Sequence, residues 1–291
     1  MAVYKRSYSA YTGKITPPWT RILVLSRYAF AEAWSSKITI GLFVFCLLPC
    51  LTSMIGIYLA NNPIARALIG GAGRQGFAID AAFFLKILQV QSWLALVLAS
   101  WIAPRLISFD LADNALPILL SHPISRVGYL FGKFVALFGS LSVVTWVPCL
   151  LLFAYQGYTS PQPWVGDNLR IAAGLFEGAI IWITLLAVLG LALSAWVKWR
   201  VVATGIIFAA VFVPAGVGAI VSAVLRTKWG LLLNLPFMIS TLWQRLLGAS
   251  ESANPRFQLP TTAIVIMLSL ACVVCLGMLD KRIRAREVVR G

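Results

Sequence analysis

The chain of 291 residues is 60% hydrophobic and only 11% charged, and its mean hydropathy is +0.88. No soluble fold of this size needs that much apolar surface, so the composition excludes a soluble enzyme or binding module and indicates a protein that crosses the membrane several times. The net charge of +15 does not indicate nucleic-acid binding, because the Lys and Arg residues lie in short segments beside the apolar runs and not in one patch.

Two segments precede the first apolar run. Residues 1–18 are polar and basic, whereas residues 19–37 combine apolar residues at near-helical spacing with charged ones. This pattern predicts an amphipathic helix in the membrane interface, with a plain cytoplasmic extension of the first span as the alternative. We therefore expect an all-α membrane protein with a tail and interfacial helix over 1–37 and a membrane domain over 38–291.

Six apolar runs are long enough to cross a bilayer as helices. The third is longer than a bilayer requires, which indicates that it tilts or projects from the membrane. Residues 225–260 are apolar but interrupted by Pro236 and basic residues, so we expect short re-entrant or interfacial helices there and not a seventh span. The six spans are expected at 38–60, 83–103, 127–155, 171–197, 201–224 and 261–279.

The distribution of basic residues predicts the orientation of the spans. Sixteen of the 24 Lys and Arg residues lie in the first 37 residues, the 104–133 segment, the 198–200 turn and the C-terminal tail. Because cytoplasmic loops carry an excess of Lys and Arg, we expect a multi-pass protein of the inner (cytoplasmic) cell membrane with both termini and the 104–126 loop in the cytoplasm.

The 104–126 loop is a polar segment between two long apolar runs. It contains Asp110 and Asp113, its apolar and acidic residues alternate in a partly helical pattern, and Pro123 ends the segment before Arg126. Two structures fit this pattern: a short amphipathic helix that docks another protein, and a plain interfacial loop.

Several short motifs frame the loop. They are Pro104-Arg105-Leu106-Ile107-Ser108 followed by Asp110, then Pro123-Ile124-Ser125-Arg126, and Gly132-Lys133 in the third span. These motifs resemble the signature of the ABC-2 type transporter permeases. The segment SRYAFAEAWSSK resembles the elbow helix of that family, in which a basic residue, a glutamate and a second basic residue precede the first span, here Arg27, Glu32 and Lys37. One departure is that Leu-Ala-Asp-Asn-Ala follows Asp110, where the family often has a further acid and a glycine.

The resemblance implies the membrane-spanning subunit of an ATP-driven exporter. The loop would then be the coupling helix that sits in a groove of a separate ATP-binding subunit. Two ATP-binding subunits and a second permease half, either the same chain or a paralogue, would complete the transporter. ATP and magnesium would bind in the partner, so the chain itself is expected to hold no cofactor or metal and not to be an enzyme. The residues that form or brace the docking site would be Arg105, Asp110, Asp113, Pro123 and Arg126.

Charges inside membrane spans are costly and therefore mark transport paths or ion pairs. Lys86 and Glu177 lie at comparable depth in the outer parts of the second and fourth spans. We expect them to pair or to line an outer vestibule together with Gln89 and Gln91. The alternative for Lys86 is that its side chain extends to the lipid headgroups.

The residues that metal binding or intramembrane proteolysis would need are not found together in the sequence. The five cysteines fall inside apolar runs without a histidine or acid beside them, so they are expected to pack between helices and not to bind a metal. An intramembrane protease needs histidines or paired acids inside the spans, and the sequence offers no such set. A non-transporting membrane anchor of an ATPase complex and an ATP-independent carrier remain the alternatives.

Overall fold

The computed structural model describes residues 18–62, 64, 78–112, 125–160, 163–249 and 258–287. Within these ranges the chain forms helices and no strands, and six helical segments are long and apolar enough to cross a membrane. This confirms the predicted all-α fold with six long apolar helices. The segments are α2 (Lys37–Asn61), α4 (Ala81–Ala112), α6 with α7 (Arg126–Val144 and Trp146–Thr159), α9 (Leu169–Trp196), α10 (Arg200–Val224) and α12 (Thr261–Glu287).

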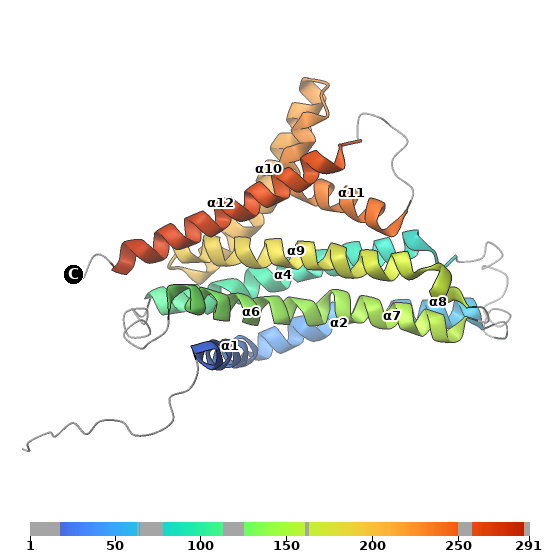
Figure 1. Ribbon diagram of the computed structural model, residues 1–291, viewed down its shortest axis with the longest axis horizontal. Helices are drawn as coiled ribbons and strands as arrows, with labels where there is room; N and C mark the ends of the chain where they lie inside the picture. Colours follow the sequence, from blue (N-terminus) through green and yellow to red (C-terminus); the bar gives the residue numbers. More distant parts are fainter. Residues whose placement is uncertain are drawn as a thin grey trace, which may run out of the picture.

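Helix α9 is the centre of the bundle. Helices α4, α6, α7, α10 and α12 all pack against it, and Figure 1 shows it running lengthwise between α12 and the α6–α7 pair. Small residues permit this packing: a Cβ atom at Gly190 of α9 would lie 3.0 Å from the Cβ atom of Ala103 in α4. Helix backbones in a membrane approach closely where side chains are small, so α9 forms the interior to which the other spans attach.

The long third apolar run is divided into two consecutive helices. Thr145 leaves the helical conformation, with φ −99° and ψ −90°, and α7 begins at the next residue. Pro148 lacks an N–H group, and its ring clashes with the carbonyl of residue 144, so the regular helical hydrogen bonding is interrupted there. The run therefore crosses the bundle as α6 followed by α7.

Helix α1 (Pro18–Trp34) lies across the bundle and not along it. Figure 1 shows α1 nearly end-on, whereas α6 runs lengthwise beside it. The buried Ala29 and Ala33 are on the side that packs against the bundle, and the Trp34 indole N–H donates to Ser140 Oγ of α6 at 3.1 Å. Leu23 and Tyr28 remain exposed, so α1 has one apolar face on the protein and a second one uncovered.

Two short helices occupy the 225–260 segment between α10 and α12. They are the 3₁₀ helix η1 (Trp229–Leu233) and α11 (Leu235–Leu247). The side chain of Asn234 caps α11 by accepting the Phe237 N–H, and Pro236 occupies the first turn, where a missing N–H group costs nothing. Gly248 ends α11 in the left-handed conformation, with φ +73°.

Figure 1 shows α1, the start of α6 and the C-terminal end of α12 at one end of the bundle, and α8 (Trp164–Asp167) at the other. We call these the α1 end and the α8 end. At the α1 end, α12 is attached to α9 by Arg282, whose Nε donates to the Ala195 carbonyl at 3.3 Å. Its guanidinium also lies over the Trp196 ring, 5.1 Å from the centroid.

A glycine-to-alanine pair tests the attachment of α11 to α9. A Cβ atom at Gly178 would lie 2.5 Å from Cδ1 of the buried Trp243, whereas a Cβ atom at Gly205 of α10 would meet no atom within 4 Å. Alanine is favoured over glycine in a helix by about 1 kcal/mol. We expect Gly205→Ala to keep or raise the unfolding temperature of the purified protein and Gly178→Ala to lower it. Equal unfolding temperatures for the two variants would show that Trp243 does not pack closely on α9.

Candidate functional site

A buried lysine joins three segments of the chain at the α1 end. Lys133 lies in α6, and only 4% of its side chain is exposed. Its Nζ atom lies 2.9 Å from Asp110 Oδ2, near the end of α4, and 3.7 Å from Glu32 Oε2 of α1. A buried ammonium group needs a partner of opposite charge, so Lys133 holds the two carboxylates together.

Tyr129 completes this cluster. It is fully buried, and its hydroxyl donates a hydrogen bond to Asp110 Oδ2, the oxygen that also contacts Lys133. Tyr129 and Lys133 lie one helical turn apart and so share a face of α6. The Lys133 Nζ atom is 5.8 Å from the centroid of the Tyr129 ring, within the range of a cation–π interaction. We call Glu32, Asp110, Tyr129 and Lys133 the charge cluster.

The local sequence explains why α6 presents this face. Ser125 caps the helix, because its hydroxyl accepts the Gly128 N–H at 3.0 Å and α6 begins at the next residue, Arg126. Gly132 has no side chain, and a Cβ atom there would lie 3.0 Å from Cδ2 of Leu25 in α1. Gly132 therefore leaves room for α1, and Lys133 forms an ion pair with Glu32 of that helix.

Helix α6 follows the 104–126 loop, and α4 forms its N-terminal side. Helix α4 continues through Pro104 to Ala112 and so brings Asp110 to the charge cluster. The hydroxyl of Ser108 donates to the Ser194 carbonyl of α9 at 3.0 Å. Both flanks of the 104–126 loop are thus attached to the bundle, and they meet each other at Asp110 and Lys133.

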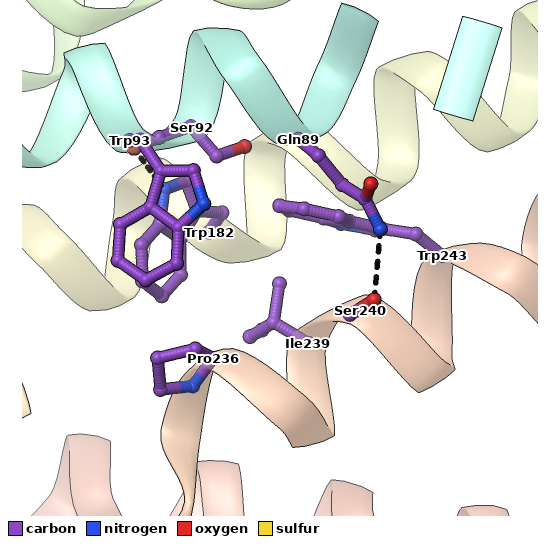
Figure 2. Close-up of a pocket in the computed structure, with 8 residues that line it drawn as sticks. All are labelled: Gln89, Ser92, Trp93, Trp182, Pro236, Ile239, Ser240 and Trp243. Atoms are coloured by element: carbon purple, nitrogen blue, oxygen red, sulfur yellow. Dashed lines mark hydrogen bonds between the residues drawn. The ribbon is translucent and has the colours of Figure 1, made fainter. Parts of the chain in front are cut away.

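A cavity of about 260 Å³ lies between α4, α9 and α11, remote from the charge cluster. Figure 2 shows Trp93, Trp182 and Trp243 around it, with Gln89 reaching across to Ser240. The Gln89 amide donates to Ser240 Oγ at 2.9 Å. The Trp182 and Trp243 indole N–H groups donate to backbone carbonyls, at 3.1 and 2.9 Å. The cavity is therefore lined largely by aromatic side chains, and the Gln89–Ser240 hydrogen bond spans it.

Residues 25–279 match the family model of the ABC-2 family transporter protein. The chain belongs to the ABC-2 transporter family. It is accordingly the multi-pass membrane component of such a transporter, a permease domain of a family that lacks the ATPase domain, and the family implies a separate ATP-binding subunit as its partner. No curated protein matches the sequence.

The predicted loop residues of this ABC-2 permease fall in different places. Asp110 lies in the charge cluster, and Arg126 is the first residue of α6. Arg105 instead faces α2, where its Nη1 donates to Thr39 Oγ1 at 3.1 Å. Asp113 and Pro123 lie outside the described residues.

The three predicted elbow residues are also separated. Glu32 joins the charge cluster, whereas Arg27 is exposed on α1 and Lys37 is exposed at the start of α2. Tyr129 and Lys133, which bind Asp110, were not among the predicted site residues. A lysine inside an apolar run, one turn after a tyrosine, is the sequence signal that could have pointed to them.

The four predicted vestibule residues do not form one group. Gln89 lines the tryptophan cavity, and Gln91 is fully buried with its amide donating to Cys50 Sγ of α2. Lys86 lines a separate cavity with Pro49, Thr52 and Ser53 of α2, and Glu177 is exposed on α9. No ion pair joins Lys86 to Glu177, because Lys86 faces α2.

The described residues contain no group of three or more His, Cys, Asp or Glu residues that could hold a metal ion. The cysteines are free thiols, and Cys46, Cys50 and Cys149 are buried among the helices.

A lysine-to-methionine pair tests the charge cluster. Removing one partner of a buried ion pair costs about 3–5 kcal/mol, because the other charge stays buried without a partner. We therefore expect Lys133→Met to lower the unfolding temperature of the purified protein markedly, and Lys86→Met, which removes an exposed lysine of α4, to change it little. Adding Asp110→Leu to Lys133→Met should restore part of the loss. An unfolding temperature for Lys133→Met equal to that of Lys86→Met would contradict the assignment.

Proposed function

We propose that this chain is the permease subunit of an ATP-driven exporter, coupled to a separate ATP-binding subunit that docks on the 104–126 loop. The observation that carries the proposal is the charge cluster. Lys133 binds Asp110 on the incoming flank of the loop and Glu32 on α1, while Lys133 itself lies on the outgoing flank. A force applied to the loop therefore acts on α1, α4 and α6 together.

The energetics favour joint movement of these three helices. Pulling Asp110 away from Lys133 and Tyr129 would leave buried polar groups without partners, at a cost of about 3–5 kcal/mol for the ion pair. Moving the helices as one body breaks none of these contacts. In this proposal ATP binding and hydrolysis in the partner shift α1, α4 and α6 as a unit between two arrangements of the permease.

The orientation is part of the proposal. The α1 end would face the cytoplasm, with α1 as the elbow helix over residues 1–37 in the membrane interface and residues 38–291 as the membrane domain. The crosswise position of α1 and its exposed apolar residues, Leu23 and Tyr28, support this placement. The turn between α9 and α10 and the basic end of α12 lie at the same end (Figure 1), which supports this orientation because cytoplasmic segments carry an excess of Lys and Arg. Helices η1 and α11 would be the re-entrant or interfacial pair of the outer side.

The complete transporter would contain two ATP-binding subunits, which hold ATP and magnesium, and two permease halves. The second half would be a copy of this chain or a paralogue. Asp110 would brace the docking loop from inside the protein. Arg105, Asp113, Pro123 and Arg126 would shape or contact its surface.

Two of the predicted vestibule residues are accessible from cavities, and we propose that they line the path of the cargo. Lys86 and Gln89 lie in neighbouring turns of α4 toward the α8 end and open into the two cavities. Gln91 would hold α4 against α2 through its hydrogen bond to Cys50, and Glu177 would line the path at the exposed surface of α9.

Co-purification with the ATP-binding subunit tests the docking site. The test uses this chain expressed together with the ATP-binding protein encoded beside it. We expect Asp113→Arg and Arg126→Glu to release that subunit, because both reverse a charge at the docking loop. Lys281→Glu, at an exposed position of α12 at the same end, should retain it. If the unmodified chain retains no ATP-binding subunit, the coupled permease is wrong and an anchor or an ATP-independent carrier becomes the better account.

A further inference from the structure

Two arginines meet where α2, α4 and α10 come together at the α1 end. Arg200, the first residue of α10, lies over the ring of Trp101, with Cζ 3.9 Å from the ring centroid. Arg105 lies one turn beyond Trp101, and both donate to Thr39 Oγ1 of α2, at 3.1 Å from Arg105 Nη1 and 3.2 Å from Trp101 Nε1. We call Arg105 and Arg200 the arginine pair.

The positive charge of the arginine pair is not neutralised by the described part of the chain. The two guanidiniums are close enough for their charges to repel each other, and both side chains are half-buried. No carboxylate of the described residues forms an ion pair with either arginine. The Nη2 atom of Arg200 is buried and has no hydrogen-bond partner among the described residues. Two partly desolvated cations side by side repel each other, so a bound anion would stabilise the arginine pair.

An apolar strip leads from the arginine pair along α4. Helices α2 and α10 both pack on α4, and the exposed apolar residues of α4 are Val97, Trp93 and Val90, which recur at helical spacing. Trp93 stacks on Phe212 of α10 with 5.6 Å between ring centroids. The strip is therefore apolar and includes a stacked aromatic pair, and the arginine pair lies at its α1 end.

The surroundings of the arginine pair are those of a bilayer surface. Trp196 and Trp199 are exposed at the turn between α9 and α10, with Lys198 between them. Tryptophan is enriched where a protein crosses from the hydrocarbon to the headgroup region. A ligand bound here would have its charged group at headgroup level and its chains along α4.

We propose that the arginine pair binds the phosphate group of an anionic phospholipid, whose acyl chains lie on the strip formed by Val97, Trp93 and Val90. Guanidinium groups bind phosphate oxygens through paired hydrogen bonds and carry their charge at every physiological pH. The start of α10, which has no side-chain cap, adds backbone N–H groups to the same site. Basic pockets between membrane helices on the cytoplasmic side bind anionic headgroups in this way. The site goes beyond the proposed docking of an ATP-binding subunit and shares with it the orientation and Arg105.

The test measures the rise in unfolding temperature that each added ligand causes in the purified chain, without an ATP-binding subunit. The ligands are phosphatidylglycerol, phosphatidylcholine and inorganic phosphate, each in the same neutral detergent. We expect phosphatidylglycerol to raise the unfolding temperature well above the rise caused by phosphatidylcholine, and to remain attached in native mass spectra. Arg200→Gln and, separately, Arg105→Gln should weaken this binding at least tenfold, whereas the matched charge removal Lys281→Gln should leave it unchanged.

Each rise is compared with the same variant without ligand, so a variant of lower basal stability still reports on binding. Equal stabilisation by phosphatidylglycerol and phosphatidylcholine would overturn the proposal. So would an equal loss of binding in Lys281→Gln, because binding would then follow net charge and not the arginine pair. Stabilisation by inorganic phosphate as large as that by phosphatidylglycerol would overturn the lipid assignment in favour of a free anion. None of these results depends on ATPase docking, so the two proposals fail separately.

Discussion

The ammonium group of Lys133 is the constraint on which the α1 end of this permease depends. A charge within a helix of an apolar run is expensive unless it is neutralised, and Lys133 is neutralised by ion pairs with Asp110 and Glu32. Its partners come from two other helices, so one charge links α1 and the end of α4 to α6. Gly132, the preceding residue, lets α1 come close enough for that pairing.

The bundle combines a packed interior with loosely covered outer helices. Helix α9 is mostly buried, whereas most residues of α2, α10 and α12 keep partial or full exposure. The inner helices hold the geometry of the charge cluster, and the outer helices keep exposed apolar surface. Movement of the outer helices relative to α9 would break mostly apolar contacts, which cost less to exchange than buried ion pairs.

The number and order of the long apolar helices could be predicted from the sequence, because a bilayer requires about 20 consecutive apolar residues per helix and charged segments separate the runs. Their ends were less predictable: α4 continues nine residues beyond the predicted end at residue 103. The short helices near Pro236 could also be predicted, because Pro236 and basic residues interrupt the apolar run there and leave it too short for a span. The break at Thr145 was not predicted, although Pro148 is a local signal for it. Asp110 and Glu32 were identified from motifs as parts of two separate elements, a loop and an elbow. Their common partner Lys133 is a tertiary contact that local spacing cannot reveal.

The direction in which a side chain points could not be read from the sequence. Lys86 and Glu177 lie at comparable positions along their helices, but Lys86 faces α2 and the pair does not form. Arg105 belongs to the loop motif by sequence and binds Thr39 of α2 in the structure. The tryptophan cavity was missed because its walls come from α4, α9 and α11, which are far apart in the sequence.

The claim that α1 and α6 move as one body can be tested most directly by joining them with a disulfide. A Cβ atom at Gly132 would lie 3.5 Å from the Leu25 Cβ atom, within the range that a disulfide requires. The measurement is the ATPase activity of the complex of Leu25→Cys/Gly132→Cys with its ATP-binding subunit, oxidised and then reduced, with each single cysteine variant as a control. The account predicts the same activity in both states, because the bond joins helices that already move together. A loss of activity on oxidation that reduction restores would show that α1 and α6 must separate, and would contradict it.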